Sequence, residues 1–135
     1  VIDPLIVIVE YNSTFGFEKK ISIPYKQDFE RSKAHHSNLY WGASIEALKF
    51  LAKQKGYKFL TTNTAGNNAY FIKENIFDKI KLDLKKNTYQ SKFRESRDES
   101  GKKTFINHDK RLSIIGHLEV EDVETNKLYK ISELL

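Results

Sequence analysis

The stretch Leu5-Ile6-Val7-Ile8-Val9-Glu10-Tyr11-Asn12 decides the fold that this chain is expected to adopt. Residues 5–9 are continuously apolar and mostly β-branched, which is typical of a strand that is buried on both faces. We therefore predict a central strand that pairs in parallel with its neighbours. Glu10, Tyr11 and Asn12 follow the carboxyl end of this strand, where open α/β sheets bind their ligands.

A second strong pattern lies between Tyr40 and Lys55, where apolar side chains recur at helical spacing. The positions i, i+4, i+7 and i+11 are occupied by Trp41, Ile45, Leu48 and Ala52. Ser37 or Asn38 can cap the start, and Gly56 follows the last turn, where a left-handed residue ends many helices. This pattern predicts one long amphipathic helix.

Shorter signals lie on either side of this helix. Residues 57–62 and 69–73 predict two strands that are separated by a turn-rich loop at residues 63–68. Residues 15–37 predict a long ordered connection, in which only residues 21–23 alternate like a short strand.

The C-terminal half gives weaker patterns. Residues 74–86 favour a short helix, and residues 90–103 favour an exposed loop. Residues 112–120 fit either a strand or a short helix. Residues 124–127 predict a turn, after which residues 128–131 form a strand that pairs back as a hairpin.

The composition of the 135 residues fits a single globular domain, residues 1–135. The lack of cysteine excludes disulfides, thiolate zinc sites and a cysteine nucleophile. It permits a reducing compartment without determining one; our prediction for the location is cytoplasmic. The longest apolar run, residues 5–9, is far shorter than the roughly 20 residues that cross a bilayer, which predicts a soluble chain with no membrane partner. The lack of methionine predicts an internal piece or a processed product.

The net charge of +5 is concentrated in the middle of the chain, between residues 73 and 111. The basic side chains of this segment include Lys79, Lys81, Lys85, Lys86, Lys92, Arg94, Arg97, Lys102 and Lys103. Such a segment can follow a phosphate backbone, with Tyr89 and Phe93 as stacking groups, so a small nucleic-acid-binding or protein-interaction module is the alternative function. The acidic residues that are interleaved with the basic ones favour a solvated surface instead.

Motifs for several common chemistries are missing from the sequence. The adjacent His35 and His36 point to different sides of any regular element, and no H-x-H or H-x-x-x-H pair exists, so no metal site is predicted. No serine lies in a G-x-S-x-G turn. Neither G-x-G-x-x-G nor a P-loop is present, so the chain has no glycine-rich loop for a nucleotide.

The remaining polar candidates are ligand contacts, and no catalytic residue is assigned. The predicted substrate-binding residues are Glu10, Asn12, His36, Tyr40, Asn63 and Asn68. The first four are expected to line a crevice at the end of the first strand, with Trp41 in the core beside them. The two asparagines flank Gly66 and can hydrogen-bond a sugar or a base edge, but Asn and Gly also satisfy the steric needs of a tight turn.

Several of these segments together carry a family resemblance. They are Ile6-Val7-Ile8-Val9-Glu10-Tyr11-Asn12, Pro24-Tyr25 with Asp28-Phe29, Leu39-Tyr40-Trp41-Gly42-Ala43-Ser44, Lys55-Gly56-Tyr57-Lys58 and Gly66-Asn67-Asn68-Ala69-Tyr70-Phe71. In this order and spacing they resemble the C-terminal half of class I S-adenosylmethionine-dependent methyltransferases, in particular uncharacterised relatives of the FkbM type. The resemblance covers residues 5–75, about half of the chain.

The resemblance implies an α/β fold with a partial Rossmann-like mixed sheet, a central buried strand, one long amphipathic helix and a C-terminal antiparallel hairpin. Residues 5–9 would be the fifth strand of that family's sheet, and the helix at residues 40–55 would follow it. The last two strands would form the antiparallel hairpin that ends the sheet. Residues 1–75 would be the methyltransferase-like half, and residues 76–135 a basic extension of unknown class.

The resemblance also implies a function. Such enzymes hold their cofactor on earlier strands that this chain does not contain, so we expect no cofactor here and infer S-adenosylmethionine only for a full-length parent. The chain would then be a methyltransferase-like piece that is inactive alone, with its methyl acceptor unassigned. A truncated sheet leaves an open edge beside residues 5–9, which predicts self-association or binding to a missing N-terminal half.

Overall fold

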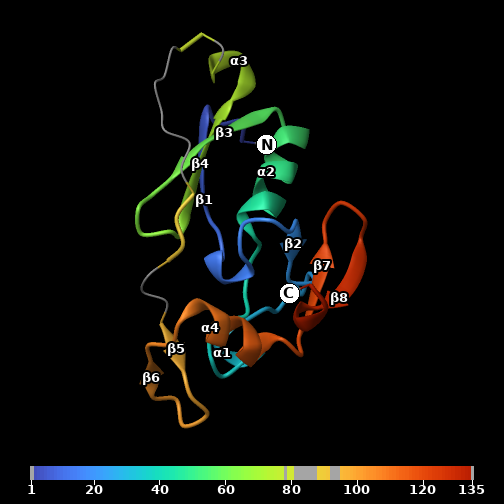
Figure 1. The fold of residues 1–135 in the computed structure, drawn as a ribbon. Coiled ribbons are helices and arrows are strands. Elements are labelled where there is room, and N and C mark those ends of the chain that lie inside the picture. The colour runs from blue at the N-terminus through green and yellow to red at the C-terminus, as the bar shows by residue number, and fades with distance from the viewer. Residues whose placement is uncertain (1, 78, 81–87, 92–94, 135) are drawn as a thin grey trace.

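The computed structural model describes residues 2–77, 79–80, 88–91 and 95–134. The chain forms short strands, several of them in consecutive pairs, and short helices between them (Figure 1). Their bounds are β1 Ile6–Glu10, η1 Ser13–Phe15, β2 Ile21–Ser22, α1 Arg31–Ala34, α2 Ile45–Gln54, β3 Tyr57–Thr62, β4 Asn68–Lys73, α3 Glu74–Phe77, β5 Ser96–Arg97, β6 Lys103–Thr104, α4 His108–Ile115, β7 Glu119–Asp122, β8 Lys127–Lys130 and η2 Ile131–Glu133.

The longest strands form a sheet in the order β1-β4-β3. The middle strand, β4, runs antiparallel to both neighbours: Ile6 of β1 lies opposite Ile72, and Tyr57 of β3 lies opposite Lys73. The β3–β4 pair confirms the predicted antiparallel hairpin. Because β1 and β3 are both antiparallel to β4, they run in the same direction, and the chain passes from one to the other through α2 on one face of the sheet (Figure 1).

The prediction of a central, parallel strand at residues 5–9 is wrong. In the described residues, β1 is an edge strand that pairs antiparallel with β4 alone, and its Ile6 and Ile8 side chains are 54% and 59% exposed. The α/β class is found, but all described strand pairs are antiparallel, so they do not form a Rossmann-like sheet. A run of β-branched residues specifies a strand, whereas its neighbours are set by the rest of the chain.

The predicted amphipathic helix is present as α2, but it begins at Ile45 and not at Tyr40. Ser44 is the N-cap, and its Oγ accepts a hydrogen bond from the backbone N–H of Ala47 at 3.1 Å. The same hydroxyl donates to the carbonyl of Lys19 at 2.6 Å, so the cap also ties α2 to the segment before β2. A serine that satisfies an orphan N–H fixes the first turn more strongly than the apolar spacing does.

The residues before this cap are held in a non-helical conformation by the neighbouring segments. The carbonyl of Ala43 accepts from the N–H of Asn12 at 2.8 Å, and the carbonyl of Gly42 accepts from the N–H of Ile23 at 2.9 Å. Gly42 has a φ of +63°, which glycine adopts without strain. Trp41 therefore belongs to the connection between α1 and α2.

Two hydrophobic clusters hold the elements together. The first lies between α2 and the main sheet, and its buried residues are Tyr11, Ile45, Ala69 and Phe71. The second joins α4 to the small sheet β2-β7-β8, and its buried residues are Phe15, Ile21, Leu39, Ile115, Val120 and Ile131. The chain leaves β1 at Tyr11 in the first cluster and reaches the second at Phe15, so the end of β1 lies between them.

The remaining sequence predictions are met in part. β2 is the short strand expected within residues 15–37, where α1 was not expected. β7 and β8 form the predicted C-terminal hairpin, and residues 112–120 hold the end of α4 and the start of β7. Residues 90–103, predicted as a loop, contain β5 and the first residue of β6.

In the region of the predicted short helix, residues 74–86, α3 covers Glu74–Phe77, and residues 78 and 81–86 lie outside the described part. None of the helices in the described ranges is long and apolar enough to span a bilayer.

Candidate functional site

Asn12, a predicted ligand contact, is fully buried at the end of β1. Its Nδ2 donates to the carbonyls of Leu39 at 2.8 Å and Trp41 at 3.0 Å. Its Oδ1 accepts from the backbone N–H of Thr14 at 3.1 Å and so caps η1. Both ends of the carboxamide are therefore engaged by the backbone, and Asn12 positions residues 39–41 against the strand end.

The segment that Asn12 positions carries a cation–π contact. The Arg31 Cζ lies 5.0 Å from the centroid of the Trp41 ring, and the Arg31 Nε donates to the carbonyl of Asn38 at 2.7 Å. Asn38 itself has a φ of +58°, in the left-handed region. Burial lowers the pKa of Arg31, and the nearby carboxylates of Glu10 and Glu95 oppose that change.

Sequence reasoning predicted Glu10 at this place but missed Arg31. Glu10 ends β1 with an exposed side chain, as expected of a residue at the carboxyl end of the strand. Arg31 lies in a polar stretch that the sequence gave no reason to distinguish from a solvated connection. Its partner Trp41 is ten residues further along, so neither helical nor strand spacing relates the two residues.

His36 lies in a group of three imidazoles. Its ring centroid is 4.2 Å from that of His35, which is 5.6 Å from that of His117 on the segment before β7. The His35 Nδ1 accepts from the backbone N–H of Ser37 at 3.2 Å, which places the proton of the neutral ring on Nε2. Burial lowers the pKa of His35, and the charges of His36 and His117 act in the same direction. Among the described residues no three His, Asp or Glu side chains are placed to hold a metal ion.

We expect His35 to make the fold less stable as the pH falls below about 6.5, the ordinary pKa of histidine. Because the folded-state pKa of His35 is below the ordinary value of 6.5, the unfolded chain binds protons first. Stability is therefore complete above pH 6.5 and is lost as the pH falls below it. Urea unfolding at several pH values measures this slope.

The variant His35→Asn keeps a side-chain acceptor for the Ser37 N–H and is expected to flatten the slope. It should not abolish the slope, because burial also lowers the pKa of His108. The carboxylate of Asp98 faces His36 and titrates in a lower range, since hydrogen bonds from Ser100 and Lys102 lower its pKa. An unchanged slope in His35→Asn would show that the stacked imidazoles do not oppose protonation.

Tyr40 lines a separate surface hollow of about 440 Å³ between α1 and β7. The lining residues are Ile23, Pro24, Tyr25, Lys26, Phe29, Ala34, Tyr40, His117, Leu118 and Glu119. The Tyr40 hydroxyl donates to the carbonyl of Glu119 at 2.5 Å, and burial, with a smaller contribution from Glu119, raises its pKa. Glu10, Asn12, His36 and Tyr40 were predicted to share one crevice. Of these four described residues, only Tyr40 lines this hollow.

Asn63 and Asn68 lie in the turn between β3 and β4. The Asn63 Oδ1 accepts from the N–H groups of Asn67 at 3.1 Å and Asn68 at 3.0 Å, and its Nδ2 donates to the Asn67 Oδ1 at 2.7 Å. The Asn63 carboxamide therefore shapes the turn itself. Asn68 begins β4 directly opposite Glu10.

Within the described residues, one edge of β1 is open. Tyr11 N–H donates to the Asn67 carbonyl, and Lys73 N–H donates to the Leu5 carbonyl. Because bonded and non-bonded pairs alternate along an antiparallel ladder, Ile6, Ile8 and Glu10 turn their backbone N–H and C=O groups to the open edge. Proteins usually protect such edges with charges or short strands, whereas this one carries exposed isoleucines.

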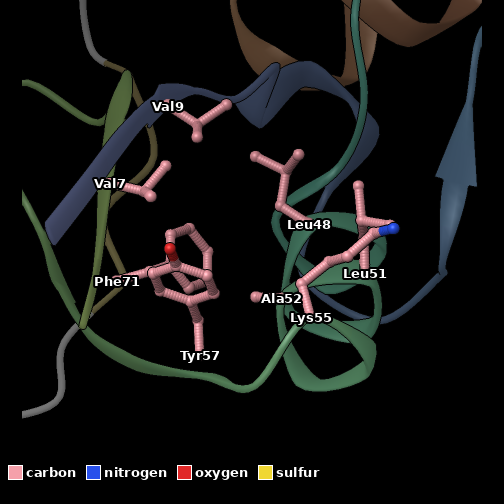
Figure 2. Close-up of a pocket in the computed structure, with 8 residues that line it drawn as sticks. All are labelled: Val7, Val9, Leu48, Leu51, Ala52, Lys55, Tyr57 and Phe71. Carbon is pink, nitrogen blue, oxygen red and sulfur yellow. The ribbon is translucent and has the colours of Figure 1, made fainter. Parts of the chain in front are cut away.

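An apolar groove of about 220 Å³ runs along the other face of β1 (Figure 2). Val7 and Val9 point from β1 toward Leu48 of α2, and Phe71 and Tyr57 lie beside them (Figure 2). Leu51, Ala52 and Lys55 complete the lining. Both faces of β1 therefore present aliphatic side chains that the described residues cover only partly.

The basic segment is described only in part. Lys81, Lys85, Lys86, Lys92 and Arg94 lie outside the described residues, and so does Phe93. Of the described basic residues, Arg97 and Lys103 pair with Glu95 at 2.7 Å and 3.7 Å. Binding to nucleic acid stays a prediction.

Comparison of the chain with models of protein families, with curated proteins and with solved structures gives no match.

Proposed function

We propose that this chain is the C-terminal, substrate-side half of a protein that resembles class I S-adenosylmethionine-dependent methyltransferases. The chain would act only when a cofactor-binding half completes the sheet at the open edge of β1. The observation that carries the proposal is this edge, because within the described residues it combines unpaired backbone groups with exposed isoleucines on one face and an apolar groove on the other.

The connection between β1 and β3 supports this proposal. Two strands that run in the same direction are joined by a connection that contains η1, β2, α1 and α2, and β4 is inserted antiparallel between them. The two-strand, one-helix unit is the building block of α/β sheets, which have helices on both faces. Here α2 covers one face, so the uncovered Ile6 and Ile8 side chains are accounted for if further elements lie against the other.

The shape of the edge favours a particular occupant. A strand that pairs with β1 takes up the free backbone groups of Ile6, Ile8 and Glu10, and an amphipathic helix connected to that strand fills the groove beside Val7 and Val9. Burying the exposed half of each isoleucine would contribute about 1 kcal/mol. Pairing of two β1 edges from two copies of the chain would leave the groove empty, so we favour a separate cofactor-binding half.

The experiment is a calorimetric titration with S-adenosylmethionine. The chain alone is expected to show no binding, because the residues that would hold the cofactor lie in the other half. The protein obtained by extending expression upstream of Val1 in the same reading frame is expected to bind it. Binding by the 135-residue chain alone, or no binding by the extended protein, would refute the proposal.

A further inference from the structure

The hollow beside Tyr40 lies where the chain leaves the small sheet β2-β7-β8. Pro24 has no N–H group and cannot extend the pairing of β2 with β7, whose last paired residue on β2 is Ser22. The chain then turns back, because the Phe29 N–H donates to the Lys26 carbonyl at 3.2 Å. Phe29 and Tyr40, from two different segments, therefore line the same hollow of about 440 Å³.

Three of the residues that line this hollow are aromatic: Tyr25, Phe29 and Tyr40. Phe29 and Tyr40 are partly buried, whereas Tyr25 is 88% exposed. A large ring that stays in water at the rim of a hollow gains apolar contact when a ligand enters. The hollow therefore has aromatic surface that is free for a ligand.

A carboxylate accompanies these rings. The Tyr40 hydroxyl donates to the backbone carbonyl of Glu119 at 2.5 Å, and Glu119 lines the same hollow. Burial raises the pKa of Tyr40, and the nearby charge of Glu119 raises it further. Lys130 lies opposite Glu119 on β8, but the two form no ion pair. Lys26, which also lines the hollow, has its own partner in Asp28 at 3.9 Å. The hollow therefore offers a negative charge that no cation of the described chain pairs with.

We propose that this hollow binds a trimethylammonium group, with the rings of Tyr25, Phe29 and Tyr40 around its methyl groups and the Glu119 carboxylate as its counter-charge. Aromatic rings attract cations through their negative faces, and a quaternary ammonium brings its charge against a ring at a small cost in hydration. The inference goes beyond the proposed function and does not depend on methyl transfer.

The hollow suits a methylated ammonium better than a primary one. A primary ammonium carries three N–H groups, each of which needs an acceptor once it leaves water. The backbone carbonyls of Lys26 and Leu118 already accept hydrogen bonds from backbone N–H groups, and that of Glu119 accepts from the Tyr40 hydroxyl. A trimethylammonium group has no N–H to satisfy, and its methyl groups can rest on apolar side chains such as Ile23.

The test is a calorimetric titration of the chain at constant ionic strength and about pH 8, above the ordinary pKa of histidine. The trimethylammonium ligands are choline and trimethyllysine with both ends of its backbone blocked. The controls are the uncharged isostere of choline, in which a tert-butyl group replaces the trimethylammonium, and ethanolamine, which has a primary ammonium.

The better of the two trimethylammonium ligands is expected to bind saturably and about tenfold more tightly than either control. Tighter binding of choline would assign the hollow to a free small molecule, and tighter binding of blocked trimethyllysine to a methylated protein side chain. No saturable binding of either ligand, or equal affinity for one of the controls, would overturn the proposal.

Variants assign the binding to the residues of the hollow. Tyr25→Ala is expected to weaken it about threefold, and Glu119→Gln about fivefold. Phe105→Ala and Glu99→Gln are the matched controls, because Phe105 is 83% exposed, Glu99 is exposed, and neither lines the hollow. Equal effects of a variant and its control would contradict the proposal. The N-methyl proton signal of the bound ligand is a second readout, since ring currents should shift it upfield, and the lack of such a shift would also overturn the proposal.

Discussion

Replacing Gly66 by alanine is expected to destabilise the fold by about 3 kcal/mol or more, a large part of the stability of a small domain. Gly66 has a φ of +72°, a conformation that costs a residue with a Cβ about 1 kcal/mol. An added Cβ would also lie 2.5 Å from the carbonyl carbon of Gln90 and 2.5 Å from the backbone nitrogen of Ser91. Backbone atoms cannot rotate away as a side chain can, so residues 88–91 must move.

Moving these residues breaks contacts that join distant parts of the chain. The Ser91 N–H donates to the Ser13 Oγ at 3.1 Å, and the Ser91 carbonyl accepts from the Arg111 Nη1 at 3.0 Å. The Tyr11 hydroxyl also donates to the Tyr89 carbonyl. Each lost hydrogen bond at a buried group costs about 1 kcal/mol, which brings the total to the expected value.

The measurement is urea unfolding followed by circular dichroism, with Gly101→Ala as the matched control. Gly101 has a φ of +82° but has no atom within 4 Å of an added Cβ, so its replacement should cost only the backbone strain, about 1 kcal/mol. Equal losses in the two variants would mean that residues 88–91 do not rest on Gly66.

This contact illustrates what the sequence could and could not predict. Asn63 and Gly66 indicate a tight turn by their own chemistry, and the turn is present. Nothing in the sequence indicates that a segment more than 20 residues later lies against this turn. Local chemistry therefore predicts the turn, whereas long-range packing decides how much it contributes to stability.

The same division explains the outcome for the two main elements. The apolar run at residues 5–9 correctly predicts a strand, but an edge strand and a central strand look alike when both faces of the edge strand are apolar. The spacing of Ile45, Leu48 and Ala52 correctly predicts α2. Trp41 continues that spacing by coincidence, because Ser44 and the ties of residues 42 and 43 begin the helix later.

The candidate site shows the same limit more strongly. Glu10 was predicted to lie at the end of a strand, and it ends β1; its role as a ligand contact stays a prediction. Asn12 was predicted by the same reasoning, but its Nδ2 donates to the backbone carbonyls of Leu39 and Trp41. These contacts depend on where residues 39–41 fold. Arg31 and His117 could not be found, since each reaches its partners through tertiary packing between segments that are far apart in the sequence.

If the proposed cofactor-binding half pairs with β1, the double variant Ile6→Lys with Ile8→Lys is expected to weaken its docking strongly. Both side chains are more than half exposed in the chain alone, so the variant should fold with a stability close to that of the parent chain. In the docked state the two lysine side chains would lie between this face of β1 and the elements that cover it. Burying unpaired charges there would cost about 3 kcal/mol or more, which weakens binding about 100-fold or more.

The binding constant is measured between the chain and the separately expressed upstream segment, with circular dichroism as the check on folding. Leu128→Lys is the control, because Leu128 is 56% exposed on β8, away from the β1 edge, and its replacement should leave binding unchanged. Unchanged binding by the double variant would show that the upstream segment does not use the isoleucine face of β1. Sedimentation of the parent chain tests the alternative that two copies pair through their β1 edges. A dimer of the parent chain that is lost in the double variant would support this alternative. That result, with no binding of the upstream segment, would replace the proposed cofactor-binding half by a second copy of the chain.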